Sequence, residues 1–167
     1  MRTLLSVAIA TLIFGGHILY LFLRRRRKEL LYPVEAGPTA DPTEDFTQKV
    51  SVRVGEMRKT KGFSYYVVRN DCMKPIGIES GDIVGVQPFD ENFKLKDVEE
   101  GDVLLIYLDD EKFHGHKIRV MDHVEGNAFV TYYYVGNKKR QPSSNPHSFN
   151  TICGVVREVN HPYGDAS

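Results

Sequence analysis

The pattern of hydrophobic and polar positions begins with one long apolar stretch. Residues 3–23 contain no Asp, Glu, Lys or Arg. As a helix, this stretch would span roughly 31 Å, close to the ~30 Å hydrocarbon core of a bilayer. A helix also satisfies its own backbone hydrogen bonds in lipid. The pattern therefore predicts a single transmembrane helix.

The rest of the chain has the short apolar runs that are typical of β-strands. Gly, Asp and Asn residues separate runs that are rich in β-branched and aromatic side chains. No long stretch has the 3.6-residue period of a helix. We expect a mainly β domain, formed by a strongly bent sheet or partial barrel of about six to eight strands. The clearest expected strands are Phe63–Val68, Ile83–Val86, Val103–Leu108, Phe129–Val135 and Ile152–Val159.

A segment of different composition lies between the apolar stretch and the β domain. Residues 33–48 contain three prolines, one glycine and many small or acidic residues. This composition predicts an exposed, extended linker. We therefore divide the chain into a transmembrane anchor with a basic flank at 1–28, a linker at 29–48 and one β domain at 49–167.

The placement of charge predicts how the chain sits in the membrane. Five consecutive cations, Arg24 to Lys28, follow the apolar stretch, whereas only Arg2 precedes it. Lys and Arg near helix ends remain cytoplasmic, so the β domain should face the cytoplasm from the cell membrane. A cleaved signal peptide is the alternative, but its apolar run is shorter, roughly 7–15 residues, and ends at a small-x-small site.

Composition excludes several classes of function for the part after the anchor. Residues 29–167 hold 16 basic and 22 acidic residues, a net charge of −6, which does not suit a nucleic-acid partner. The two cysteines, Cys72 and Cys153, form no disulfide framework, and a cytoplasmic domain keeps them reduced. His114, His116 and His123 lack cysteine partners and an HExxH pattern, so we expect no metal and no cofactor.

Three polar motifs next to expected strands occur in a distinctive order. They are NDCMKP at 70–75, a pair of Gly-Asp-apolar units at 81–84 and 101–104, and FHGHKIRV at 113–120. Together they resemble the LexA/UmuD-like self-cleaving peptidase domain, which shares its fold with type I signal peptidases. The resemblance covers roughly residues 34–160. It implies a bent-sheet peptidase domain with a protein or peptide substrate and, by analogy, a homodimer.

The resemblance also implies which residues form the site. Cys72 occupies the position of the family's nucleophilic serine, and the family's catalytic lysine falls at His116 or Lys117. Strand alternation places His116 on the apolar face of its strand and Lys117 on the other face. A thiol and an imidazole form a coherent pair, since their reference pKa values are ~8.5 and ~6.5. His116 is therefore the first prediction for the base, and Lys117 is the alternative.

Members of this family cut an Ala-Gly or Cys-Gly bond that precedes the domain. Ala36-Gly37 lies in the corresponding segment here, between the anchor and the domain. The first hypothesis is a membrane-anchored peptidase that cuts this bond or a partner protein in the cytoplasm. Two alternatives stay open: a signal-peptidase-like membrane protease, and a non-catalytic membrane adaptor on the same fold.

Overall fold

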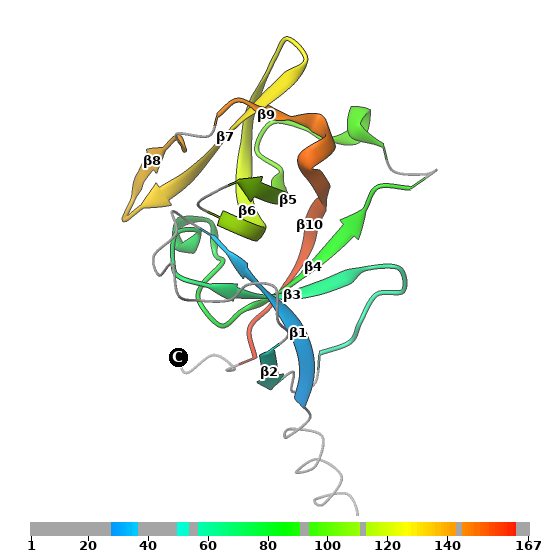
Figure 1. Cartoon of the computed structure of the whole chain (residues 1–167). Coiled ribbons are helices and arrows are strands. Elements are labelled where there is room, and N and C mark those ends of the chain that lie inside the picture. The colour runs from blue at the N-terminus through cyan, green and yellow to red at the C-terminus, as the bar shows by residue number, and fades with distance from the viewer. Residues whose placement is uncertain are drawn as a thin grey trace, which may run out of the picture.

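The computed structural model describes residues 28–36, 50–53, 57–90, 94–110, 113–142 and 145–162. Within these residues, ten strands form one mixed sheet and there is no α-helix (Figure 1). The expectation of a mainly β domain is therefore confirmed. None of the described residues belongs to a helix with the length and apolar character needed to cross a membrane. The predicted transmembrane segment at 3–23 lies outside the described residues.

The strands follow the apolar runs of the sequence. Each of the five clearest expected strands is present, with ends that differ by no more than two residues. The strands are β1 (Lys28–Glu35), β2 (Val50–Arg53), β3 (Ser64–Arg69), β4 (Ile83–Pro88), β5 (Val103–Asp110), β6 (Phe113–Glu125), β7 (Ala128–Val135), β8 (Lys138–Arg140), β9 (His147–Ser148) and β10 (Ile152–Asn160). The described residues hold more strands than the six to eight expected. Three of the ten strands are short (β2, β8 and β9), and β1 lies in the segment expected to be a linker.

Six of the strands close into a ring. β3, β4, β10, β5 and β6 follow one another through antiparallel pairs, and β1 pairs with both β3 and β6. β1 runs parallel to these two neighbours, whereas every other pairing among the described strands is antiparallel. The ring is thus closed by β1, the first described strand of the chain (Figure 1).

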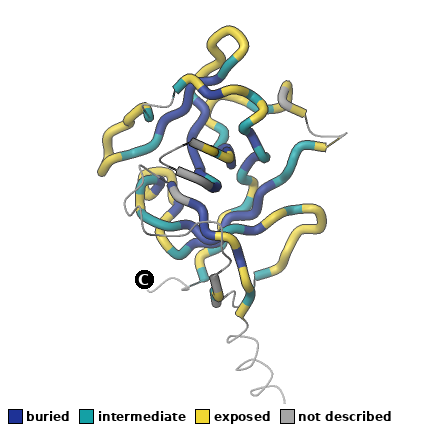
Figure 2. Tube along the Cα trace, viewed as in Figure 1, coloured by how far each residue is buried: buried dark blue, intermediate teal, exposed yellow. Residues whose placement is uncertain are grey.

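The largest buried cluster fills this ring. It takes apolar side chains from β1, β3, β4, β5, β6 and β7. A second cluster lies between β5, β6, β7 and β10, and a third joins β1, β3 and β4. Buried positions lie along the strands and exposed positions lie mainly in the connecting loops (Figure 2). β1 contributes to two of the three clusters, so the ring and its core depend on the same strand.

The segment that we expected to be an exposed linker is partly buried. β1 covers residues 28–35, and the side chains of Val34 and Ala36 are 0 % exposed. The expectation of exposure is wrong for these two residues because β1 has a neighbouring strand on each side. Their side chains belong to the cluster that fills the ring. Residues 37–48, which complete the expected linker, lie outside the described residues.

Candidate active site at the end of strand β1

Cys72 lies in a tight turn directly after β3. Asn70 leaves the strand with a φ of 66°, a left-handed conformation that asparagine tolerates better than most residues. The next residue after the cysteine, Met73, forms an isolated bridge with Ile78. The Cys72 carbonyl accepts a hydrogen bond from the Tyr134 N–H at 3.0 Å. The half-buried cysteine is therefore fixed to β3 on one side and to β7 on the other.

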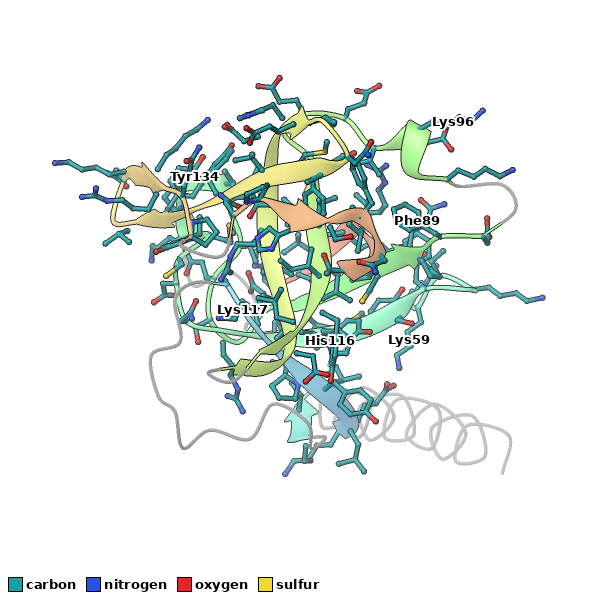
Figure 3. The ribbon with its side chains drawn as sticks, turned by 45° about the horizontal axis from the view of Figure 1, so that its top comes forward. Lys59, Phe89, Lys96, His116, Lys117 and Tyr134 are labelled. Carbon is teal, nitrogen blue, oxygen red and sulfur yellow. The ribbon has the colours of Figure 1, made fainter. Side chains whose placement is uncertain are left out.

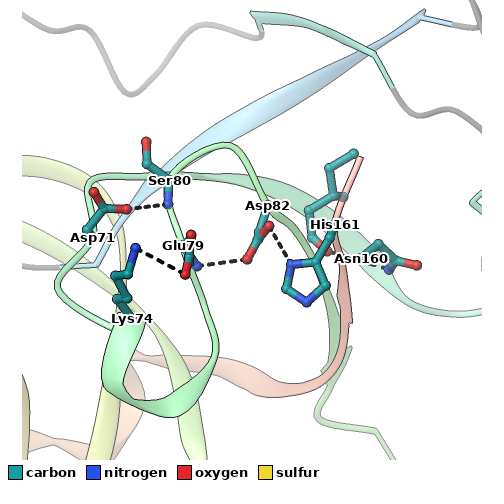
Figure 4. Close-up of polar contacts among 8 residues, drawn as sticks. Asp71, Lys74, Glu79, Ser80, Asp82, Asn160 and His161 are labelled. Carbon is teal, nitrogen blue, oxygen red and sulfur yellow. Dashed lines mark hydrogen bonds and ion pairs between the residues drawn. The ribbon is translucent and has the colours of Figure 1, made fainter. Parts of the chain in front are cut away.

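Polar contacts hold the far side of this turn (Figure 4). Asp71 Oδ1 accepts a hydrogen bond from the Ser80 N–H at 2.8 Å. Asp82 Oδ2 accepts one from the Glu79 N–H at 2.7 Å, and Asp82 Oδ1 lies 2.8 Å from His161 Nδ1. Because His161 directly follows β10, the turn that carries Cys72 is connected to the end of the last strand.

Ala36, the first residue of the predicted cleavage bond, lies directly after β1. Its N–H donates a hydrogen bond to the Arg69 carbonyl at 3.3 Å, which continues the parallel pairing of β1 with β3. Its fully buried side chain belongs to the same cluster as Met73, and Cys72 packs against that cluster. Ala36 therefore pairs with Arg69, which lies three residues before Cys72, and Ala36 and Cys72 contact the same buried cluster. Gly37 lies outside the described residues.

Lys117 occupies the position on β6 that faces the end of β1. In the backbone register, Glu35 lies between Arg69 of β3 and Lys117 of β6. Lys117 is therefore one register position away from Ala36. Its side chain is only 5 % exposed, although lysine side chains are rarely buried to this extent. A buried lysine whose backbone pairs with Glu35, the residue before the predicted cleavage bond, is a candidate base.

His116 has different surroundings, although it is the neighbour of Lys117 in the sequence (Figure 3). Its ring centroid lies 5.1 Å from that of Tyr66 on β3 and 5.2 Å from that of Tyr107 on β5. Burial lowers the pKa of His116 below the usual value. The imidazole is therefore neutral near pH 7, and it is also a weaker base than an exposed histidine. Both residues stay predictions for the base.

Cys153 and His123, two further candidates from the sequence, each have local contacts of their own. Cys153 is half-buried, its Sγ contacts the Thr151 carbonyl at 3.8 Å, and burial raises the pKa of its thiol. His123 is exposed and its Nδ1 lies 3.1 Å from Asp122 Oδ2. The side chain of His114 is outside the described part of the structure. Within the part of the chain that the structure describes, no group of three or more His, Cys, Asp or Glu residues could hold a metal ion.

The sequence analysis missed the contribution of β1 to this site. Val34, Glu35 and Ala36 alternate between apolar or small and polar residues, a pattern that is typical of a strand with one buried face. Pro33 and Pro38 made a linker the more natural prediction, because proline is rare inside sheets. The period-two pattern before Gly37 was the available indication that this segment pairs with the domain.

Comparisons with known proteins do not assign a function to this chain. The sequence matches no model of a known protein family and no curated protein. The functional assignment therefore depends on the resemblance of the motifs and on the geometry around Cys72, Lys117 and Ala36.

Proposed function

We propose that the protein is a membrane-anchored peptidase of the LexA/UmuD-like type that cuts its own chain between Ala36 and Gly37. Its domain faces the cytoplasm, as the basic flank after the apolar stretch predicts. The observation that supports this most strongly is the docking of β1 between two parallel neighbours. Addition of an extended segment to a sheet is a common way to hold a peptide for recognition. Here the docked segment ends at Ala36, which pairs with Arg69 just before the turn that carries Cys72.

The proposed reaction proceeds through a thioester. The Cys72 thiolate attacks the Ala36 carbonyl carbon and a C–S bond forms, while backbone N–H groups of the turn stabilise the oxyanion. The C–N bond to Gly37 then breaks, and the leaving amine takes the proton that the base removed from the thiol. Water hydrolyses the thioester, which restores the thiol and leaves a carboxylate on Ala36.

We assign the role of base to Lys117, with His116 as the alternative. Lys117 is buried and lies beside the residue that precedes Ala36. A lysine amine in its neutral form can accept the proton of a thiol. His116 lies between two tyrosine rings, and its lowered pKa makes it a poorer proton acceptor.

Mass spectrometry of the full chain, expressed in membranes and purified in detergent, tests this function. We expect one fragment that ends at Ala36 and another that starts at Gly37. Cys72→Ala should abolish both fragments, while Cys153→Ala is the matched control that should retain them. Because β1 is docked in its own domain, the rate should not depend on protein concentration. A wild-type chain that stays intact through prolonged incubation contradicts the proposal.

A non-catalytic membrane adaptor is the second candidate, and the closure of the ring by β1 is the observation that favours it. A strand that completes a barrel is buried for structural reasons alone, whether or not a bond beside it is cut. In an adaptor, Cys72 is an inert thiol. A thiol-reactive probe that labels Cys72 no faster than the half-buried Cys153 supports the adaptor over the peptidase.

A further inference from the structure

The contacts that hold β1 in the ring do not depend on the bond between Ala36 and Gly37. Its second half pairs with β3 at four positions, from Tyr32 to Glu35, and with β6 at Glu35. Its first half pairs with β2 at four positions, from Lys28 to Leu31. β2, β3 and β6 all come after the proposed cut in the sequence. The C-terminal fragment would therefore surround the strand that the cut separates from it.

The side chains of β1 are buried in two different clusters. Val34 and Ala36 are 0 % exposed and belong to the cluster that fills the ring. Leu31 is 5 % exposed and belongs to the cluster with Tyr65 and Ile83. Departure of β1 would open the ring between β3 and β6 and expose both clusters to water, which is unfavourable.

An ion pair adds a contact near the membrane end of the strand. The Lys59 ammonium pairs with the Glu29 carboxylate. The same ammonium lies 5.4 Å from the centroid of the Tyr65 ring, within the range of a cation–π contact. Lys59 belongs to the C-terminal fragment and Glu29 belongs to the N-terminal fragment, so this pair would also remain after the cut.

We propose that β1 stays bound after the chain is cut, so that the domain remains attached to the membrane as a non-covalent complex. The N-terminal product then keeps its place between β3 and β6 and prevents another segment from pairing there, which limits the enzyme to one turnover. This inference rests on the proposed function for the cut itself. Retention of the strand depends only on the contacts of β1 described above.

A cut made by an added protease separates this inference from self-cleavage. The full-length Cys72→Ala chain receives the recognition sequence of a site-specific protease in place of residues 39–45, between β1 and β2. The protein is placed in vesicles of neutral lipid, cut to completion and sedimented at high salt. We expect the domain to sediment with the vesicles. Prompt appearance of the folded domain in the supernatant after complete cutting overturns the proposal.

A pair of variants shows whether β1 is the attachment. Val34→Asp places a charge at a fully buried position of β1 and should release the domain after the cut. Val124→Asp makes the same change at a position on β6 that is 54 % exposed and should leave the domain bound. Retention that is unaffected by Val34→Asp contradicts the proposal, because the vesicles would then hold the domain in some other way.

A charge reversal gives a second measurement that does not depend on a buried substitution. Lys59→Glu places two carboxylates opposite each other and should speed release after the cut by roughly twofold to fivefold, as expected for a partly exposed ion pair. The double variant Lys59→Glu with Glu29→Lys should return to the wild-type rate. Identical release rates for the single and double variants contradict a contribution of this pair. Circular dichroism of each released domain shows whether it is still folded.

Discussion

Substitutions at two adjacent residues of β6, His116 and Lys117, should have different effects on cleavage. Lys117→Met removes the amine but keeps an apolar side chain of similar length, so we expect no cleavage after Ala36. His116→Phe keeps an aromatic ring between Tyr66 and Tyr107, so we expect cleavage to continue within about tenfold of the wild-type rate. The measurement is the yield of the fragment that starts at Gly37 over time. Loss of cleavage in His116→Phe and its persistence in Lys117→Met would move the role of base to His116.

His147 shows a second effect of burial on a single residue. Its side chain is 4 % exposed, and its Nε2 has no hydrogen-bond partner in the described part of the chain. Burial, and then the charge of Arg119, lower its pKa from 6.5 to about 4. The unfolded chain therefore binds a proton as the pH falls through ~6.5, whereas the folded chain stays neutral until about pH 4. Protonation in this interval favours the unfolded state.

This difference predicts how stability depends on pH. Between pH 7 and pH 5, His147 should lower the free energy of unfolding of the wild-type protein by about 2 kcal/mol. In His147→Leu this contribution is absent, so the free energy of unfolding should fall less over the same interval. Urea denaturation of both proteins at the two pH values measures the difference, and all other titrating groups are shared. Equal losses of stability would show that His147 is protonated equally in the folded and unfolded states.

Among the elements, the antiparallel pairing of β10 with β4 depends on the absence of a side chain at Gly154. A Cβ there would lie 2.3 Å from the Gln87 carbonyl oxygen and 2.8 Å from a Val86 side-chain atom. The register of β10 with β5 also shifts between Ile152 and Gly154. Backbone in the middle of a sheet cannot move aside without breaking its pairing on the other side. The close approach of the two strands therefore requires glycine.

Gly154→Ala should destabilise the domain by about 2–3 kcal/mol, at the upper end of the cost of overpacking a core. Gly126→Ala is the matched control, because a Cβ at Gly126 meets nothing within 4 Å. Its φ of 59° gives this control a cost of about 1 kcal/mol from backbone strain alone. Thermal or urea denaturation compares the two variants. A smaller loss in Gly154→Ala than in Gly126→Ala would contradict the close approach.

The elements also show which parts of the fold the sequence could predict. β4, β5, β7 and β10 have continuous apolar, β-branched runs between turn residues, and such runs form strands in most surroundings. β1 has no such run, because Pro33 interrupts it, and it becomes a strand through pairing with residues much later in the chain. Pairing between distant segments is a tertiary effect that a local pattern does not contain.

In the candidate site, the identity of the residues could be predicted from the sequence, but their surroundings could not. Cys72, His116 and Lys117 could be chosen from motif order, since Cys72 follows β3 and the other two residues lie on β6. Their surroundings could not, because Tyr66 and Tyr107 reach His116 from two other strands. The position of Lys117 beside the end of β1 likewise depends on the closure of the ring.

In the whole molecule, no residue separates the basic flank of the predicted anchor from the first strand of the ring. Lys28 is the last cation of the basic flank and the first residue of β1. β1 is eight residues long, so Ala36 lies at most roughly 30 Å along the chain from the end of the basic flank. The proposed cut would therefore lie close to the membrane surface, and β1, which ends just before the cut, would be the link between the predicted anchor and the ring.

The orientation of the whole chain gives the last prediction. The cations from Arg24 to Lys28 should keep the domain in the cytoplasm, because Lys and Arg beside a membrane helix are retained on that side. An exposed reporter cysteine, Lys138→Cys on β8, should therefore resist a membrane-impermeant thiol reagent in intact cells and react after the membrane is permeabilised. Wild-type protein, with Cys72 and Cys153 only, gives the background labelling. Rapid labelling of Lys138→Cys in intact cells would place the domain outside, and the signal-peptidase-like alternative would then replace self-cleavage in the cytoplasm as the better hypothesis.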